Sequence, residues 1–170
     1  MNDPQNHIFF WKPQQGKERC LSNWYPILFI DNNIEFEHTE QYMMYMKALL
    51  FEKTNIDLHK LILNTKSPAK CRSYGKKIKN FDENIWNKNK KEIVTKGCYL
   101  KFSQNEELKR YLISTGTKIL VEASPYDKIW GIGLNKKDAI KTPQDKWLGT
   151  NYLGECLMEV RNMLISESNN

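Results

Sequence analysis

Two ionisable side chains share one face of a predicted helix near the start of the chain. Glu40 and Lys47 lie seven residues apart in the segment EQYMMYMKALLF, so they project from the same face about 10 Å apart along the axis. A carboxylate in the first helical turn is stabilised by the helix dipole, and it can activate water or stabilise a developing cation. A lysine among apolar neighbours can lose its charge and become a nucleophile.

Both residues also fit ordinary structural roles. Acids are common in the first turn of a helix, and a lysine at the edge of an amphipathic helix usually extends its ammonium group to water. The pattern of this helix by itself therefore leaves the choice between a catalytic pair and a purely structural one open.

A second group of candidates follows a strand predicted over residues 119–121. After the strand come two acids, a tryptophan and two glycines: Glu122, Asp127, Trp130, Gly131 and Gly133. One of the acids can supply the second carboxylate of a hydrolytic site, and glycine permits backbone shapes that other residues resist. The two acids could also be ordinary loop residues, and the glycine spacing is that of neither a Rossmann nor a Walker phosphate loop.

Five further residues could contact a ligand: Asn23, Trp86, Lys101, Asn151 and Gly154. An exposed tryptophan can stack on a base, and a helix that begins near residue 151 offers free N–H groups to phosphate. Core packing, capping and turn formation are the alternative roles of these residues.

Hydrophobic spacing and capping residues predict the elements that position these side chains. Helices are expected after a Thr39 N-cap, over 56–63, from Ser67-Pro68 to about 79, over 83–103 after an Asp82 cap, over 105–115, and from about 151. Apolar runs at 8–11 and 27–30 and an alternating segment at 33–37 suggest short strands, with a hairpin turn at 31–33. We expect a polar loop over 135–149. The fold class is a mostly helical α+β domain with a few short strands.

Composition sets further limits. The 170 residues are 40% hydrophobic and 27% charged, as expected for one globular domain over 1–170 with a polar C-terminal tail. The net charge of +6 suits a phosphate-bearing partner without indicating nucleic acid. Basic runs at 76–79 and 87–92 could form one patch, or they could be solvated helix faces.

Four scattered cysteines, without a C-x-x-C pair or a histidine cluster, argue against a metal site. The sequence has neither a signal peptide nor an apolar run of membrane-spanning length, so we expect a cytoplasmic, intracellular protein with no membrane partner.

The order of the motifs is more specific than any one of them. LSNWYP, EHTEQYMMYMKA, LKFSQN, LVEAS, IWGIGL and NYLGECLMEVR follow one another in an order that resembles the NADAR family, also called YbiA-like, over about residues 8–165. Two positions depart from the family pattern. Gln41 stands where many relatives carry histidine, and Trp24 stands where another aromatic residue is common.

The resemblance implies a largely helical α+β fold and an enzyme that cleaves N-glycosidic bonds to ribose without a cofactor. The implied substrates are the reactive early intermediates of riboflavin biosynthesis or ADP-ribosylated guanine, so the partner is a ribose-phosphate or ADP-ribose-bearing molecule, including ADP-ribosylated nucleic acid. With the residue analysis, it predicts catalytic roles for Glu40, Lys47 and Asp127. It also predicts substrate binding by Asn23, Trp86, Lys101, Glu122, Trp130, Gly131, Asn151 and Gly154. In this interpretation the glycines let the backbone approach the ligand.

Two mechanisms remain open for such an enzyme. Glu40 or Asp127 could activate water for direct hydrolysis of the bond. Alternatively the ribose ring opens and Lys47, with Lys101 as the other candidate, forms a Schiff base that water then releases. A non-catalytic ADP-ribose or nucleotide-binding module is the rival function, and it would not need the pair formed by Glu40 and Lys47.

Overall fold

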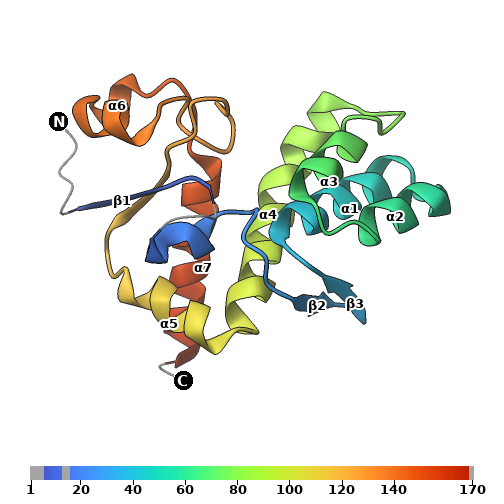
Figure 1. Cartoon of the computed structure of the whole chain (residues 1–170), viewed down its shortest axis with the longest axis horizontal. Coiled ribbons are helices and arrows are strands. Elements are labelled where there is room, and N and C mark those ends of the chain that lie inside the picture. Colours follow the sequence, from blue (N-terminus) through green and yellow to red (C-terminus); the bar gives the residue numbers. More distant parts are fainter. Residues whose placement is uncertain (1–5, 13–15, 169–170) are drawn as a thin grey trace. The chain divides into compact units, whose positions relative to one another are not determined.

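The computed structural model describes residues 6–12 and 16–168. The chain divides into two units (Figure 1). Unit 1 contains Met1–Tyr25 and Asn105–Asn170, and unit 2 contains Pro26–Gln104. Helices dominate both units and the strands are short, so the predicted α+β class is confirmed.

Unit 2 begins with a β-hairpin. Strand β2 (Phe29–Asp31) pairs antiparallel with β3 (Ile34–Phe36). Asn32 and Asn33 have φ angles of 49° and 64°, the left-handed conformation that a two-residue turn of this kind needs and that asparagine tolerates. The predicted hairpin turn is therefore confirmed.

The four helices of unit 2 are α1 (Thr39–Phe51), α2 (Ile56–Leu63), α3 (Pro68–Gly75) and α4 (Glu83–Ser103). Helix α1 packs against the other three (Figure 1). The bounds predicted for α2 and α4 are confirmed, whereas α3 ends four residues before the predicted end at 79. The Thr39 N-cap is wrong, because Nδ1 of His38 accepts the Gln41 N–H at 3.0 Å and caps α1 instead.

A glycine allows α4 to lie close to α1. A Cβ atom at Gly97 would lie 2.7 Å from Cδ1 of Tyr42, too close for ordinary packing. Close packing therefore explains a glycine in the middle of a helix, where it costs about 1 kcal/mol relative to alanine. The Tyr42 hydroxyl donates to Asp31 at 3.0 Å, and Lys96 forms an ion pair with Asp31 at 2.9 Å, so the hairpin is tied to both helices.

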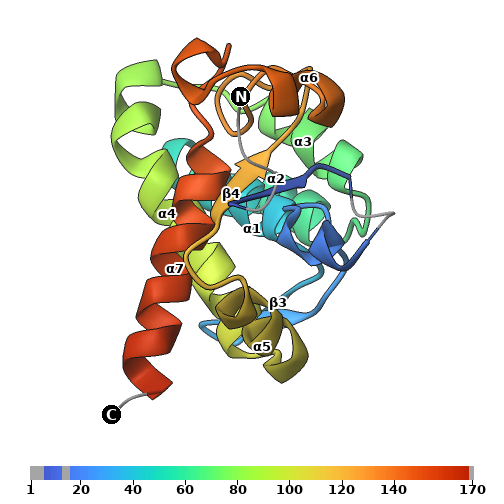
Figure 2. The same ribbon diagram turned by 90° about the vertical axis from the view of Figure 1, so that its left-hand side faces the viewer.

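Unit 1 is built on a parallel strand pair. Strand β1 (His7–Phe10) pairs with β4 (Ile119–Glu122), and helix α7 (Tyr152–Ser168) packs against β4 (Figure 2). Unit 1 also contains the 3₁₀ helix η1 (Lys17–Leu21) and helix α5 (Glu106–Ser114). The helix expected over 105–115 is thus confirmed, with Asn105 and Thr115 as its caps.

The polar loop expected over 135–149 is wrong for part of its length. It contains helix α6 (Lys136–Lys141) and the 3₁₀ helix η2 (Gln144–Lys146). The Asn135 side chain accepts the Asp138 N–H at 3.0 Å and caps α6. Ala139 is fully buried in a hydrophobic cluster and Ile140 packs against it, so two apolar residues hold α6 to unit 1.

None of the helices in the described part of the chain combines the length and the apolar character that crossing a membrane requires.

Candidate active site

The first turn of α1 carries a buried carboxylate. Glu40 is only 6% exposed, so its side chain lies away from bulk solvent. The Glu40 charge also acts on the thiol of Cys71 in α3. Burial raises the pKa of Cys71 to about 12, and the negative charge of Glu40 acts in the same direction. Cys71 is therefore a protonated neighbour of Glu40 at neutral pH.

A fully buried lysine lies at the same end of α1. Lys101 is 0% exposed, which is rare for a lysine. It follows Gly97 by one turn of α4, and Gly97 contacts both Thr39 and Tyr42 in the first turns of α1. Burial lowers the pKa of His38 to about 4, and the positive charge of Lys101 acts in the same direction. Unit 2 thus gathers Glu40, Lys101 and a neutral His38.

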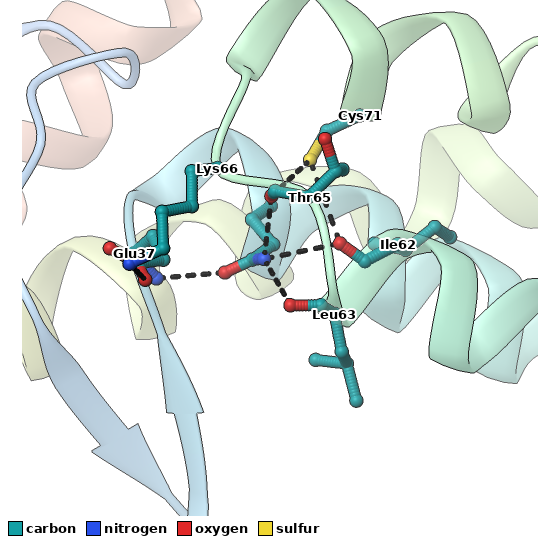
Figure 3. Close-up of polar contacts among 7 residues, drawn as sticks. Glu37, Ile62, Leu63, Thr65, Lys66 and Cys71 are labelled. Atoms are coloured by element: carbon teal, nitrogen blue, oxygen red, sulfur yellow. Dashed lines mark hydrogen bonds and ion pairs between the residues drawn. The ribbon is translucent and has the colours of Figure 1, made fainter.

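The backbone around Glu40 is fixed by its neighbour Gln41, which is fully buried. Oε1 of Gln41 accepts the Glu37 N–H at 2.7 Å. Nε2 lies 3.0–3.1 Å from three carbonyl oxygens, those of Ile62 and Leu63 at the end of α2 and of Thr65 in the connection to α3 (Figure 3). The departure from the family's histidine therefore has a structural role here, since Gln41 joins the start of α1 to the α2–α3 connection.

Lys47 lies beside two aromatic rings. Its Nζ donates to the Gly75 carbonyl oxygen at 3.1 Å and lies 4.3 Å and 5.4 Å from the ring centroids of Phe81 and Trp86. Burial lowers the pKa of Lys47. The structure therefore brings together two predicted residues, Lys47 and Trp86. Sequence reasoning missed Phe81, although its type and its position just before the Asp82 cap were visible.

The loop after β4 positions Asp127 and Trp130 in unit 1. Oδ1 of Asp127 accepts the N–H groups of Ile129 and Trp130 at 2.9 and 2.8 Å, which closes a tight turn. The Trp130 ring is half-buried and lies 6.4 Å from the Tyr152 ring, centroid to centroid. One carboxylate oxygen of Asp127 therefore orients the loop that carries Trp130.

Asn151 holds the same loop to the strand. Its Oδ1 accepts the Glu122 N–H at 3.0 Å, and its Nδ2 donates to the Leu120 carbonyl oxygen at 2.9 Å. A Cβ atom at Gly154 would clash with that same carbonyl, and one at Gly131 would lie 2.9 Å from the Glu122 carbonyl oxygen. The Cβ sides of Gly131 and Gly154 therefore face protein backbone, and the expected approach of Gly131 and Gly133 to a ligand stays a prediction.

The remaining predicted residues lie at the ends of elements in unit 1. Asn23 is buried in a turn that Ser22 closes: Oγ of Ser22 accepts the Trp24 N–H at 3.2 Å and the Ser22 carbonyl accepts the Tyr25 N–H at 3.1 Å. Glu122 is half-buried at the end of β4.

The predicted residues fall into two groups, one in each unit. Unit 2 contains Glu40, Lys47, Trp86 and Lys101, and unit 1 contains Asn23, Glu122, Asp127, Trp130, Gly131, Asn151 and Gly154. A single site that uses both groups, and the role assigned to each residue, stay predictions. Within residues 6–12 and 16–168, no three His, Cys, Asp or Glu side chains are grouped so that they could hold a metal ion.

A model of the NADAR domain matches residues 9–165. The chain belongs to the NADAR family. This NADAR chain is 42% identical to N-glycosidase R617 of Acanthamoeba polyphaga mimivirus, over 94% of this chain and 96% of that protein. It is also 39% identical to the chloroplastic riboflavin biosynthesis protein PYRR of Arabidopsis thaliana over 85 residues. These residues cover 50% of this chain and 12% of PYRR.

The NADAR chain also shares its fold with a solved structure. The NMR structure of the Escherichia coli protein YbiA superposes with a TM-score of 0.78 at 23% identity, covering 98% of this chain and 89% of YbiA. The resemblance to the NADAR family and the predicted fold are thereby confirmed. The predicted enzyme class, a hydrolase of N-glycosyl bonds, is confirmed at the level of the family.

Proposed function

We propose that this NADAR chain hydrolyses the N-glycosidic bond between a ribose and a base. The substrate is either a reactive early intermediate of riboflavin biosynthesis or ADP-ribosylated guanine. The observation that carries the proposal is the burial of two ionisable side chains: Glu40 in the first turn of α1, and Lys101 of α4, which packs against α1. The names of the relatives R617 and PYRR support the reaction and the first substrate class.

The chemistry of the bond explains why a buried carboxylate is useful. Cleavage of an N-glycoside develops positive charge at the anomeric carbon of the ribose. A carboxylate in a site with little water stabilises that charge more strongly than one in bulk solvent, and it can also activate the attacking water. Because His38 stays neutral, it adds no opposing positive charge beside Glu40.

Lys47 offers a second route through a covalent intermediate. In the ring-opened ribose the amine adds to the anomeric carbon, the base leaves with a proton, and water hydrolyses the resulting Schiff base to release ribose and the free lysine. The lowered pKa of Lys47 supports this route, since only the neutral amine is a nucleophile. Lys101 is the alternative lysine.

The test is a parallel assay of both substrate classes. The purified chain is incubated with ADP-ribosylated guanosine and with the ribosylated riboflavin intermediates, and release of the free base is followed by chromatography. We expect release from at least one substrate, and the same rate from an Asp57→Asn control, because Asp57 is an exposed acid of α2. Binding of both substrates without release would contradict the proposal and indicate a non-catalytic ADP-ribose or nucleotide-binding module.

A further inference from the structure

Two aromatic rings meet at the edge where β1 and β4 end. Trp11 directly follows β1, and Tyr126 lies four residues after the end of β4. Because the two strands are parallel, the chain leaves both at the same edge of the pair. The centroids of the two rings are 5.9 Å apart, with an angle of 49° between their planes. In open α/β sheets, ligands bind outside this carboxyl edge of the strands.

The pair is open to solvent. Tyr126 is 83% exposed, so its ring buries little surface and contributes little to packing. Trp11 is half-buried beside it. Such a ring offers a face on which a planar ligand can stack.

A cation completes the group. Nζ of Lys12 lies 4.5 Å from the centroid of the Trp11 ring, and the Lys12 side chain is exposed. Two rings and an exposed ammonium group together match a molecule that has both a planar ring and a phosphate. Tyr126 also directly precedes Asp127, one of the residues predicted to be catalytic.

We propose that Trp11 and Tyr126 stack on a planar heteroaromatic ring of the substrate, and that Lys12 binds its phosphate. This inference rests on the proposed function and makes Tyr126 a residue that determines which substrates are accepted. A heteroaromatic ring and a phosphate are common to both proposed substrate classes, so the ligand is a nucleotide in either case.

Calorimetric binding of guanosine 5′-monophosphate (GMP), adenosine 5′-monophosphate (AMP) and ribose 5-phosphate tests the stacking. Tyr126→Ala should weaken binding of the two nucleotides by about 5- to 150-fold and leave ribose 5-phosphate unchanged, because only the nucleotides have a base to stack. Tyr126→Phe should bind as the wild type does, and Met163→Ala, an exposed position on α7, is the matched control. A stronger effect on GMP than on AMP would assign the ring to guanine, and the reverse to adenine.

Lys12→Gln tests the phosphate contact. This variant should weaken the binding of GMP more than the binding of guanosine, whereas Lys141→Gln on α6 should change neither affinity. The inference is overturned if Tyr126→Ala binds GMP as tightly as the wild type, or if its affinity for ribose 5-phosphate falls as much as its affinity for GMP. It is also overturned if the wild type binds no nucleotide at millimolar concentration.

These experiments distinguish failure of the nucleotide-binding inference from failure of the proposed reaction. If the wild type releases no base from either N-glycoside while GMP binding still depends on Tyr126, the nucleotide surface stands and the proposed reaction fails. If the wild type is active and Tyr126→Ala keeps both the same kcat/KM and the same GMP affinity, the reaction stands and this inference fails.

Discussion

Lys47 of α1 donates a hydrogen bond of 3.1 Å to the carbonyl oxygen of Gly75, the last residue of α3. This contact and the faces of Phe81 and Trp86 favour the ammonium form, whereas burial lowers the Lys47 pKa and favours the neutral amine. A nucleophilic Lys47 must therefore first lose a proton, which frees a lone pair and leaves two N–H groups that can still donate to Gly75.

Reduction with borohydride during turnover tests that role of Lys47. If the Schiff base forms, reduction should fix a substrate adduct that peptide mapping places on Lys47. Lys47→Arg keeps a cation beside Gly75 but cannot form a Schiff base, so it should stay folded and lose both adduct and turnover. Lys60→Arg, on an exposed position of α2, should keep both.

An adduct on Lys101 would support the Schiff-base mechanism and assign the nucleophilic role to Lys101 instead of Lys47. Absence of any adduct, together with an active Lys47→Arg variant, would leave direct hydrolysis by the carboxylates as the mechanism.

The N-cap of α1 makes stability depend on pH. The pKa of His38 is about 4 in the folded chain and about 6.5 when unfolded, so the unfolded state binds the extra proton between these values. The His38 contribution is thus fully present above pH 6.5 and is lost as the pH falls towards 4. Protonation also removes the Nδ1 acceptor that caps α1.

We expect the free energy of unfolding to fall by about 2–3 kcal/mol through His38 between pH 7 and 4.5. Urea unfolding at the two pH values measures it. His38→Asn can still cap the helix but does not titrate, so its free energy of unfolding should fall less than that of the wild type between the two pH values. Equal losses in the wild type and the variant would show that other groups cause the pH dependence.

Asn151 provides a test that separates structural from binding roles. Asn151→Ala removes both hydrogen bonds to β4, and we expect the free energy of unfolding to fall by about 2–4 kcal/mol. Asn84→Ala, at an exposed position of α4, should change stability little. Thermal unfolding measures both variants. An unchanged melting temperature combined with weaker substrate binding would instead make Asn151 a ligand contact.

The elements that could be predicted are those with local signals. Asn32-Asn33 has the residue types of a tight turn, and Asp82 caps its own helix through the Ile85 N–H. Thr39 is a common capping residue and predicts a start of α1 one residue late, whereas the ring nitrogen of His38 supplies the cap. The sequence does not predict helix α6 because four of its six residues are charged and only Ala139 and Ile140 mark the core side.

In the candidate site, too, the residues with a local sequence signal could be predicted, and those that depend on contacts between distant segments could not. Glu40 and Lys47 were identified from spacing along one helix, and the burial of Glu40 agrees with a protected carboxylate. The neighbours of these residues depend on contacts between distant segments. Phe81 reaches Lys47 from the α3–α4 connection, and Tyr126 reaches Trp11 through the pairing of β1 with β4. No periodicity within either segment contains that information.

The rate of base release by Glu40→Gln tests the central claim most directly. Glutamine has nearly the same size as glutamate but cannot take up a proton or carry the negative charge, so the fold should survive at the start of α1. With the substrate that the wild type hydrolyses, at saturating concentration, we predict a fall in kcat of roughly 10²-fold or more. A folded Glu40→Gln variant that keeps kcat within a few-fold of the wild type would contradict a catalytic role for the buried carboxylate.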